Sequence, residues 1–557
     1  MYTKTLKICL ILLGLIIISP TFFGILGVIF PAFGYFPTLG GNSFSFKFFI
    51  ELFSIPGIMQ SSLLSFSSGV FSTIFALLFS QIILIYIYDT KIFYYLKILI
   101  SPLLALPHLT MAVGLLFLMS SSGLIVRILS PWLTGFDRPP EFYLIPDQYG
   151  LSLILGLTLK EIPFFLLTSI AALEQFPSRK IFKVGRSLQH STFSTWWLLL
   201  FPIIYQRIKL VIFIVIAFSS SVIDMALILA PTTPSTLSIR ILQVYQSFEF
   251  DAIFAASSLA LVQMLIILII MLIWNKVEIV FKTQFMFLFI IKFLPRKNFI
   301  IGKYLYFLAV SLILLSIIGL LNSIFWAIGQ DWYFPDILPN KYSLIQLINF
   351  LKTNEIMILT TLYIAFLVSF SSVFIIILWI ELCDYLNIKK SYFEGLIFLP
   401  LFIPQISFLI GLQSFLIKIG LQSYLISLVW VEILYVLPYC FILLGPAFRD
   451  INKQYLYLAS SLGKSRLQRL FLIKIPLISS SILTSFAIGI IISLSLYTPV
   501  YFIGAGRITT LTVETLNLAL SGSRQDLGVA TVFQIILPIL ILLIITYTNK
   551  KFNNWSF

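Results

Sequence analysis

The chain has 557 residues, of which 60% are hydrophobic and only 10% are charged, and its mean hydropathy is +1.06. A soluble protein has about a quarter of its residues charged, so this composition excludes a set of water-soluble domains and indicates a protein whose main solvent is lipid. The net charge of +15 does not indicate nucleic acid as a partner, because the basic residues lie in short clusters between apolar runs and not along one basic face.

Apolar segments long enough to cross a bilayer, which takes roughly 20 residues, recur along the whole chain. The first follows Lys4 and Lys7 and is longer than the apolar region of a signal peptide, so we expect it to remain as a transmembrane helix. In chain order, the expected spans are 8–30, 61–86, 96–119, 151–174, 208–230, 252–274, 304–326, 356–381, 393–417, 423–446, 480–503 and 529–547. These twelve spans make an even number, which places both termini on the same side of the membrane.

The distribution of lysine and arginine indicates which side this is. Most of these residues lie in the N-terminal segment, in 175–209, 275–303 and 448–476, and in short segments that alternate with the spans in the same phase. In contrast, the segments 131–150 and 327–355 are rich in Pro, Asp, Trp and Tyr. By the positive-inside rule, we expect both termini in the cytoplasm and the protein in the cytoplasmic (inner) membrane.

The two halves of the chain repeat each other in the same direction. The third spans share Pro107 with Pro404 and Gly114 with Gly411. The paired segments are 61–71 with 360–370, 106–124 with 403–421, and 236–240 with 510–514. We therefore expect an all-α membrane protein of two tandem parallel six-helix domains that enclose a pathway. Their expected bounds are 1–280 and 304–557, with a cytoplasmic linker at 281–303.

A long basic loop lies between the fourth and fifth spans of each half. The loops read KVGRSLQHSTFSTWWLLLFP at 183–202 and YLASSLGKSRLQRLFLIKIP at 457–476. Each has Ser-Leu before a pivot, at Gln189 or Gly463, and a proline thirteen residues after it. Because glycine adopts a positive φ at low cost at a helix end, the pattern predicts two helical stretches joined by a turn.

These loops resemble the EAA loop of ABC importer permeases, whose pattern is Glu-Ala-Ala, three residues, Gly and a later Leu-Pro. The matching positions are Lys183, Gly185, Leu188, Gln189 and Pro202 in the first loop, and Tyr457, Ala459, Leu462, Gly463 and Pro476 in the second. Both copies depart from the pattern, since Lys183 and Tyr457 stand in the place of Glu and Gln189 in the place of Gly. The resemblance covers nearly the whole chain, and the layout is similar to fused double permeases for thiamine, ferric iron and related solutes.

The resemblance implies that each loop forms a coupling helix on a cytoplasmic ATPase, so that two ATPase copies bind the ATP and an external solute-binding protein delivers the solute. This chain would then hold no cofactor and no catalytic residue. Gly463-Lys464-Ser465 is similar to the end of a phosphate-binding P-loop, but Leu458 stands where that motif needs a glycine. We therefore expect no ATPase site in the chain.

Four charged residues interrupt apolar spans, namely Lys160, Glu161, Asp224 and Glu432. A charge at the bilayer centre costs about 2.5–3.5 kcal/mol on insertion scales, so such residues usually face a bundle interior or a cavity. One interpretation is that Glu161, Asp224 and Glu432 line the translocation pathway and favour a cationic solute. The other is that they form internal salt bridges or interhelical hydrogen bonds.

Two other functional classes are open at this stage. A secondary transporter could use the buried carboxylates as ion sites, but the paired loops argue against it. A membrane enzyme or a scaffold would not explain the duplicated loops, and the residues suggest no metal ligands or nucleophile–base pair. We expect structural roles for His108 and His190, and packing roles for Cys9, Cys383 and Cys440.

Overall fold

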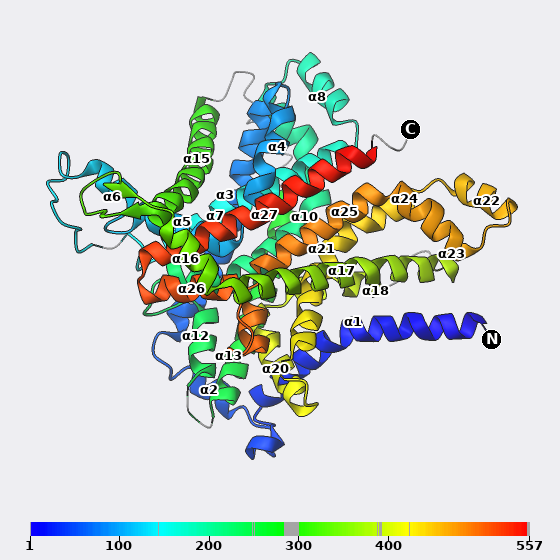
Figure 1. The fold of residues 1–557 in the computed structure, drawn as a ribbon, viewed down its shortest axis with the longest axis horizontal. Coiled ribbons are helices and arrows are strands. Elements are labelled where there is room, and N and C mark those ends of the chain that lie inside the picture. The colour runs from blue at the N-terminus through cyan, green and yellow to red at the C-terminus, as the bar shows by residue number, and fades with distance from the viewer. Residues whose placement is uncertain are drawn as a thin grey trace.

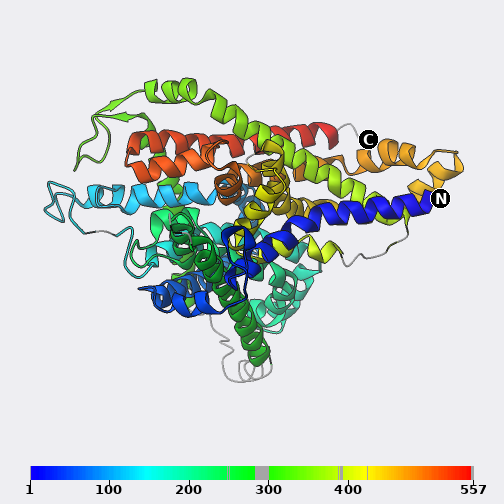
Figure 2. The same cartoon turned by 90° about the horizontal axis from the view of Figure 1, so that it is seen from below.

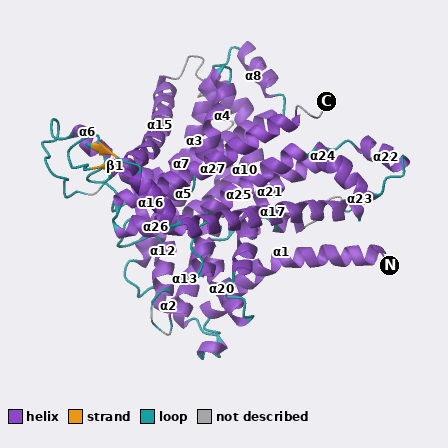
Figure 3. Cartoon of the chain, in the orientation of Figure 1, coloured by secondary structure: helices purple, strands orange, loops and turns teal. Residues whose placement is uncertain are grey.

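The structure is a computed structural model that describes residues 2–553 apart from 143, 248, 250, 283–299, 387, 389–392 and 423. Helices dominate the described residues, as Figure 3 shows, and their only strands are the short antiparallel pair β1 (Gly329–Gln330) and β2 (Lys341–Tyr342). Most of the linker expected at 281–303 lies outside the described residues.

The described helices of the first half follow in the order α1 (Tyr2–Ala32), η1 (Pro37–Leu39), α2 (Lys47–Leu52), α3 (Ile58–Ile87), α4 (Ile92–Ala105), α5 (His108–Met119), α6 (Leu124–Leu129), α7 (Leu151–Glu174), α8 (Ser178–Ser187), α9 (Thr192–Thr195), η2 (Trp196–Leu200), α10 (Phe201–Ser221), α11 (Asp224–Leu229), α12 (Leu237–Tyr245) and α13 (Ala252–Val280). Those of the second half are α15 (Ile300–Ile328), α16 (Ile345–Thr353), α17 (Glu355–Tyr385), α18 (Phe393–Leu396), α19 (Leu399–Phe402), α20 (Gln405–Lys418), α21 (Leu425–Arg449), α22 (Lys453–Ser461), α23 (Arg466–Arg469), η4 (Leu470–Lys474), α24 (Ile475–Leu477), α25 (Ser479–Ser495), η5 (Val500–Gly504), α26 (Leu511–Ser521) and α27 (Arg524–Asn553).

Ten helices in the described part of the chain are long and apolar enough to cross a membrane. Two bent pairs bring the number to twelve if each is one span: Glu394–Phe402 with Gln405–Lys418, bent by 106°, and Arg466–Leu477 with Ser479–Ser495, bent by 75°. The expected all-α polytopic membrane protein is confirmed.

Four spans that we expected to be continuous are interrupted, namely 96–119, 208–230, 393–417 and 480–503. In two of them the break precedes a proline, at Leu106 and Ile403, whose ψ angles of 142° and 133° are extended. The proline ring disfavours a helical conformation of the residue before it and has no N–H for the helix ladder. In the other two the backbone becomes extended at Val222 and Leu496.

Equivalent hydrogen bonds confirm that the two halves share a local architecture. The hydroxyl of Ser65 on α3 accepts from the N–H of Leu237 at 2.9 Å, and that of Thr361 on α17 accepts from the N–H of Leu511 at 3.0 Å. The sequence comparison paired Ser65 with Ile364, which is wrong by three residues. Three residues are close to one helical turn, so the pairings of Ser65 with Thr361 and with Ile364 place it on nearly the same helix face. The hydrophobic pattern of the sequence therefore did not distinguish the two pairings.

The first helix of each half packs on the other half. Helix α1 lies along α20, and α15 lies along α5. Both crossings are close contacts between glycines: a Cβ on Gly27 would lie 2.6 Å from the carbonyl oxygen of Gly411, and one on Gly319 would lie 2.9 Å from that of Gly114. Small residues let helix backbones approach closely inside a membrane. Within each half, α3, α7 and α10 pack together, as do α17, α21 and α25.

Figures 1 and 2 place the start of α1, the end of α27 and helix α22 toward one end of the long axis, and α6 with the strands toward the other. Helix α22 leads into the second basic loop, 457–476, whereas β1 and β2 belong to the segment 327–355, which is expected on the opposite side of the membrane. The molecule therefore separates the basic loop and the two chain ends from the Pro- and Trp-rich loops.

Candidate functional site: a cavity between the halves and two exposed loops

A cavity of about 580 Å³ lies between the two halves. All four broken spans contribute lining residues next to their breaks, including Leu106, Asp224, Ile403 and Tyr497. Irregular backbone at membrane depth is tolerated where it is buried in protein or lines a cavity. The breaks therefore explain why polar groups gather at this place. From Asp224 and Tyr497 the lining continues to Asn549 near the end of α27.

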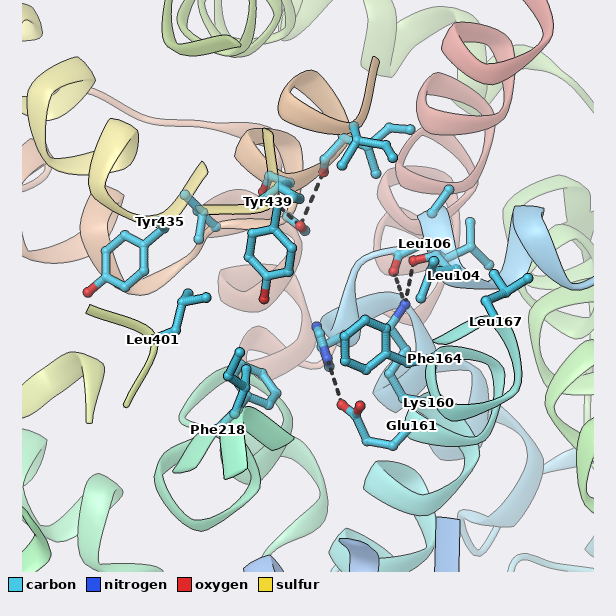
Figure 4. A pocket seen from close by; sticks show the side chains of 18 of the residues that line it. Leu104, Leu106, Lys160, Glu161, Phe164, Leu167, Phe218, Leu401, Tyr435 and Tyr439 are labelled. Atoms are coloured by element: carbon cyan, nitrogen blue, oxygen red, sulfur yellow. Dashed lines mark hydrogen bonds and ion pairs between the residues drawn. The ribbon is translucent and has the colours of Figure 1, made fainter. Parts of the chain in front are cut away.

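Lys160 closes the broken end of α4. Its ammonium group donates hydrogen bonds to the carbonyl oxygens of Leu103 at 3.2 Å, Leu104 at 2.9 Å and Leu106 at 2.5 Å. A helix C-terminus carries partial negative charge and free carbonyls, which a cation stabilises. Figure 4 shows the Lys160 amine turned to these carbonyls while Glu161 points away from it. Lys160 thus holds the wall of the cavity.

Glu161 and Asp224 both lie near His108. The His108 Nε2 is 3.4 Å from the Glu161 Oε1, and its ring lies 4.4 Å from that of Phe218, between centroids. Asp224 is close enough to His108 to interact electrostatically with it, and its carboxylate accepts the backbone N–H of Met225. The side chains of Glu161, Asp224, His108 and Phe218 all line the cavity. The structure therefore brings two of the three acids expected in the pathway together.

The third acid, Glu432, lies elsewhere. Its side chain is buried on α21 and accepts a hydrogen bond from the hydroxyl of Ser493 on α25, and it is not among the lining residues of the cavity. One carboxylate oxygen, Oε1, has no hydrogen-bond partner among the described residues. This placement matches the interhelical bond that was the second interpretation of the buried acids.

Aromatic rings form much of the remaining wall. Tyr435 and Tyr439 come from α21, Phe164 from α7, and Tyr497 from the break after α25. Tyr439 lies within electrostatic range of Glu161, and Figure 4 shows both projecting into the same space. The wall opposite the acids is therefore aromatic and belongs to the second half.

Beyond Tyr497, two hydrogen bonds join the halves. The hydroxyl of Tyr245 on α12 donates to the Gln413 Oε1 on α20 at 2.8 Å, and the Gln246 amide donates to the hydroxyl of Tyr501. The Tyr497 and Tyr501 rings lie 5.5 Å apart between centroids. These contacts join the two halves next to Tyr497, which lines the cavity.

Both long loops have the hinged helical form predicted from the sequence. Helices α8 and α22 each end two residues before a pivot with positive φ. The φ angle is 64° at Gln189 and 74° at Gly463. A π-helical segment, η2 or η4, follows in each loop and leads to Pro202 or Pro476. The first loop thus adopts the same turn as the second although glutamine replaces glycine.

The matched loop residues divide into exposed and buried positions. The exposed ones are Lys183, Leu188, Gln189, Tyr457, Leu462, Gly463 and Pro476. Pro202, the equivalent of Pro476 in the first loop, is half-buried. Gly185 and Ala459 are buried, and a Cβ on Gly185 would lie 2.9 Å from a Leu199 methyl group. Each helix therefore needs a small residue where it packs on the following segment. The apolar side chains of Leu188 and Leu462 are 65% and 78% exposed, so both loops present an apolar surface.

Different contacts fix each loop to its own half. In the first, the Tyr88 hydroxyl donates to the Ser178 hydroxyl at 2.7 Å, and its ring packs edge-on against Trp196. In the second, Lys474 forms ion pairs with Glu381 at 2.5 Å and with Asp384 at 3.0 Å. Each loop is therefore attached to the second span of its half, α3 or α17.

The residues Gly463-Lys464-Ser465 form the turn between α22 and α23. The Ser465 hydroxyl accepts the backbone N–H of Gln468, and the Gln468 side chain accepts the backbone N–H of Ser465. This capping box gives Ser465 a structural role. A helix, not a strand, precedes the turn, unlike in a P-loop. Among the described residues, no group of three His, Cys, Asp or Glu side chains could hold a metal ion.

Sequence reasoning missed three residues of the cavity. His108 was expected to be structural, and Tyr439 and Tyr497 were not singled out. The one available signal for His108 was its place directly after Pro107 in a span, because a proline break exposes polar groups to a cavity. Tyr439 and Tyr497 gave no such signal, since an aromatic residue in an apolar span usually packs against lipid or core.

A duplicated multi-pass helical protein with a cavity between its halves has the architecture of a membrane transport protein. No protein-family model matches the chain. Over 515 residues, which cover 90% of this chain and 91% of the other, it is 24% identical to the inner membrane ABC transporter permease protein YnjC of Escherichia coli strain K12. The similarity therefore extends through most of both halves.

Proposed function

We propose that the chain is the fused permease subunit of an ABC importer in the inner membrane. The similarity to an ABC transporter permease over 90% of the chain is the observation that carries this proposal. The duplicated loops support it, because each presents an exposed leucine, Leu188 or Leu462, directly after a helix and is fixed to α3 or α17. Two copies of a separate ATPase would bind these loops, hydrolyse ATP and supply the energy.

The cavity is the proposed pathway, with Glu161 and Asp224 as its acidic groups. With both termini in the cytoplasm, the lining near Asn549 faces inward and the contacts beyond Tyr497 face outward. In this proposal, the contacts beyond Tyr497 hold the two halves together on the outward side. Movement of the loops would reorient the halves and expose the cavity to an external solute-binding protein.

Crosslinking to the ATPase tests the proposal. We would remove Cys9, Cys383 and Cys440, place single cysteines at Leu188 and Leu462, and treat membranes with a thiol–amine crosslinker. Both sites are expected to capture an ATPase with ABC signature motifs, whereas a control cysteine at the exposed Leu338 is expected to capture none.

Transport by the purified protein supplies the second measurement. In proteoliposomes that contain the permease and the captured ATPase, uptake of the transported solute is expected to require ATP. Uptake that an ion gradient drives without any ATPase would replace the proposal with a secondary transporter.

A further inference from the structure

Among the described residues, the Asp, Glu, Lys and His side chains that line the cavity all come from the first half. The repeat gives each of them an equivalent position in the second half, when Pro107 is aligned with Pro404, Pro163 of the fourth span with Pro438 of the tenth, and segment 236–240 with 510–514. The equivalent pairs are His108 with Gln405, Lys160 with Tyr435, Glu161 with Val436, and Asp224 with Thr498. In every pair the second-half residue is uncharged. Both members of three pairs line the cavity, and in the fourth Glu161 does.

This division leaves negative charge on one wall. The ammonium group of Lys160 is occupied by three carbonyl oxygens, and its position at the end of α4 keeps it there. Glu161 has one long contact, of 3.4 Å, with His108. The first-half wall thus has two carboxylates but one ammonium group, and that ammonium group is already bound by backbone carbonyl oxygens. A ligand that brings a positive charge therefore has a favourable partner only on this wall.

The rest of the lining suits an organic molecule. Phe164 and Phe218 line the cavity together with the acids, and Tyr439 projects from α21 into the same space. Aromatic faces attract ammonium groups, most strongly where water is excluded. Cavities of about 300–1,000 Å³ with apolar walls and a few convergent polar groups are typical of small-molecule sites, and this cavity of about 580 Å³ falls within that range.

A bare metal cation fits less well. Such ions need several oxygen, nitrogen or sulfur ligands at one point. In the described part of the chain, no group of three His, Cys, Asp or Glu side chains could hold a metal ion. A metal ion that entered the cavity would lose its hydration shell and gain contacts mainly with aliphatic and aromatic side chains.

We infer that the cavity binds a small organic cation in a fixed orientation. Its positive group lies beside Glu161 and Asp224 of the first half, and its uncharged part lies against Tyr439 of the second half. The inference rests on the proposed permease function and adds the class of solute and the division of recognition between the halves.

Thermal protection of the permease–ATPase complex tests the inference. The probes are benzyltrimethylammonium, phenylacetate as an anion of similar size, and Fe³⁺. Only benzyltrimethylammonium is expected to protect. Glu161→Gln and Asp224→Asn are each expected to weaken its affinity about tenfold, as loss of a hydrogen bond or contact to a charged group does.

The second half supplies the matched control. Glu432 is also a buried carboxylate, but it lies outside the cavity and bonds to Ser493. Glu432→Gln is expected to leave the affinity for benzyltrimethylammonium unchanged. The charge-preserving variants Glu161→Asp and Asp224→Glu are expected to recover most of the binding, which separates loss of charge from misfolding.

The outcomes distinguish this inference from the proposed function. Protection by phenylacetate or Fe³⁺, or equal losses in Glu161→Gln and Glu432→Gln, would overturn the organic-cation site while the ATPase stays bound. Failure of the chain to bind an ATPase at all would instead overturn the permease proposal. Protection by benzyltrimethylammonium that depends on Glu161 and Asp224 supports the inference.

Discussion

Asp147 lies just before α7, outside the membrane-spanning part of that helix. Its carboxylate accepts hydrogen bonds from the Ser152 N–H at 2.7 Å, the Ser152 hydroxyl at 2.5 Å, the Leu151 N–H at 2.9 Å and the Tyr149 N–H at 3.0 Å. Burial raises the pKa of Asp147, but the hydrogen bonds from Ser152, Leu151 and Tyr149 outweigh it and lower the pKa below its ordinary value. This one side chain accepts hydrogen bonds from the first two N–H groups of α7, those of Leu151 and Ser152.

A lowered pKa links this contact to pH. The stabilisation is present above the ordinary carboxyl pKa and is lost as the pH falls through the lowered pKa of the folded protein. Asp147→Asn is expected to lose about 0.5–2 kcal/mol, as for removal of a helix cap, measured by thermal unfolding in detergent at neutral pH. The difference from wild type should vanish in acid, and Asp137→Asn, at an exposed position, should have no effect. A difference that persists in acid would contradict the role assigned to the ionised carboxylate.

The pivots of the two loops give a second prediction at the scale of one residue. Gly463 has a φ of 74° and no other atom near its missing side chain, so Gly463→Ala adds only the cost of a left-handed conformation, about 1–2 kcal/mol. We expect weaker copurification of the ATPase with this variant. Gly463→Asn should retain binding, because asparagine tolerates this conformation, and Gln189→Gly should retain or strengthen it. Equal binding by Gly463→Ala and wild type would show that the turn is not needed.

At the scale of elements, the spans and the repeat were predictable from sequence because hydropathy and self-similarity are read within one segment. The breaks at Pro107 and Pro404 were also visible as prolines, yet the sequence does not say whether a proline kinks a helix or ends it. The roles of His108 and Lys160 were not predictable, because each depends on which broken ends meet. Those contacts join residues more than fifty positions apart, and no local pattern records them.

The hydrogen bonds of Tyr245 with Gln413 and of Gln246 with Tyr501 join elements of different halves. If the halves separate to open the cavity outward, these elements must part. In a cysteine-free background, Tyr245→Cys with Gln413→Cys, joined by a bifunctional thiol reagent, is expected to abolish ATP-driven uptake. The control pair, Asp331→Cys with Lys341→Cys, replaces an ion pair of 2.8 Å within one loop and should leave uptake unchanged. Uptake that continues with the first pair joined would mean that the halves do not separate there.

At the scale of the whole molecule, the two halves are held together by the exchanged helices α1 and α15. Gly319→Ala places a methyl group 2.9 Å from the carbonyl oxygen of Gly114, and overpacking of this kind costs about 1–3 kcal/mol. We expect a lower melting temperature in detergent. Gly395→Ala, at a helical glycine with open space around it, should be neutral or slightly stabilising, since alanine favours helix by about 0.5–1 kcal/mol. If both variants melt alike, the crossing is not close-packed.

The exchange of α1 and α15 also bears on how the polypeptide can be divided. A protease cut or a stop and restart of translation between residues 282 and 300 would give two fragments. The first helix of each fragment, α1 or α15, would pack on the other fragment. Neither fragment could bury its own third span without its counterpart, so each would have to mature in the company of the other. The peptide that joins the two halves sets their ratio at one to one and keeps them near each other during insertion. The packing of α1 and α15 on the opposite halves is what holds the folded halves together.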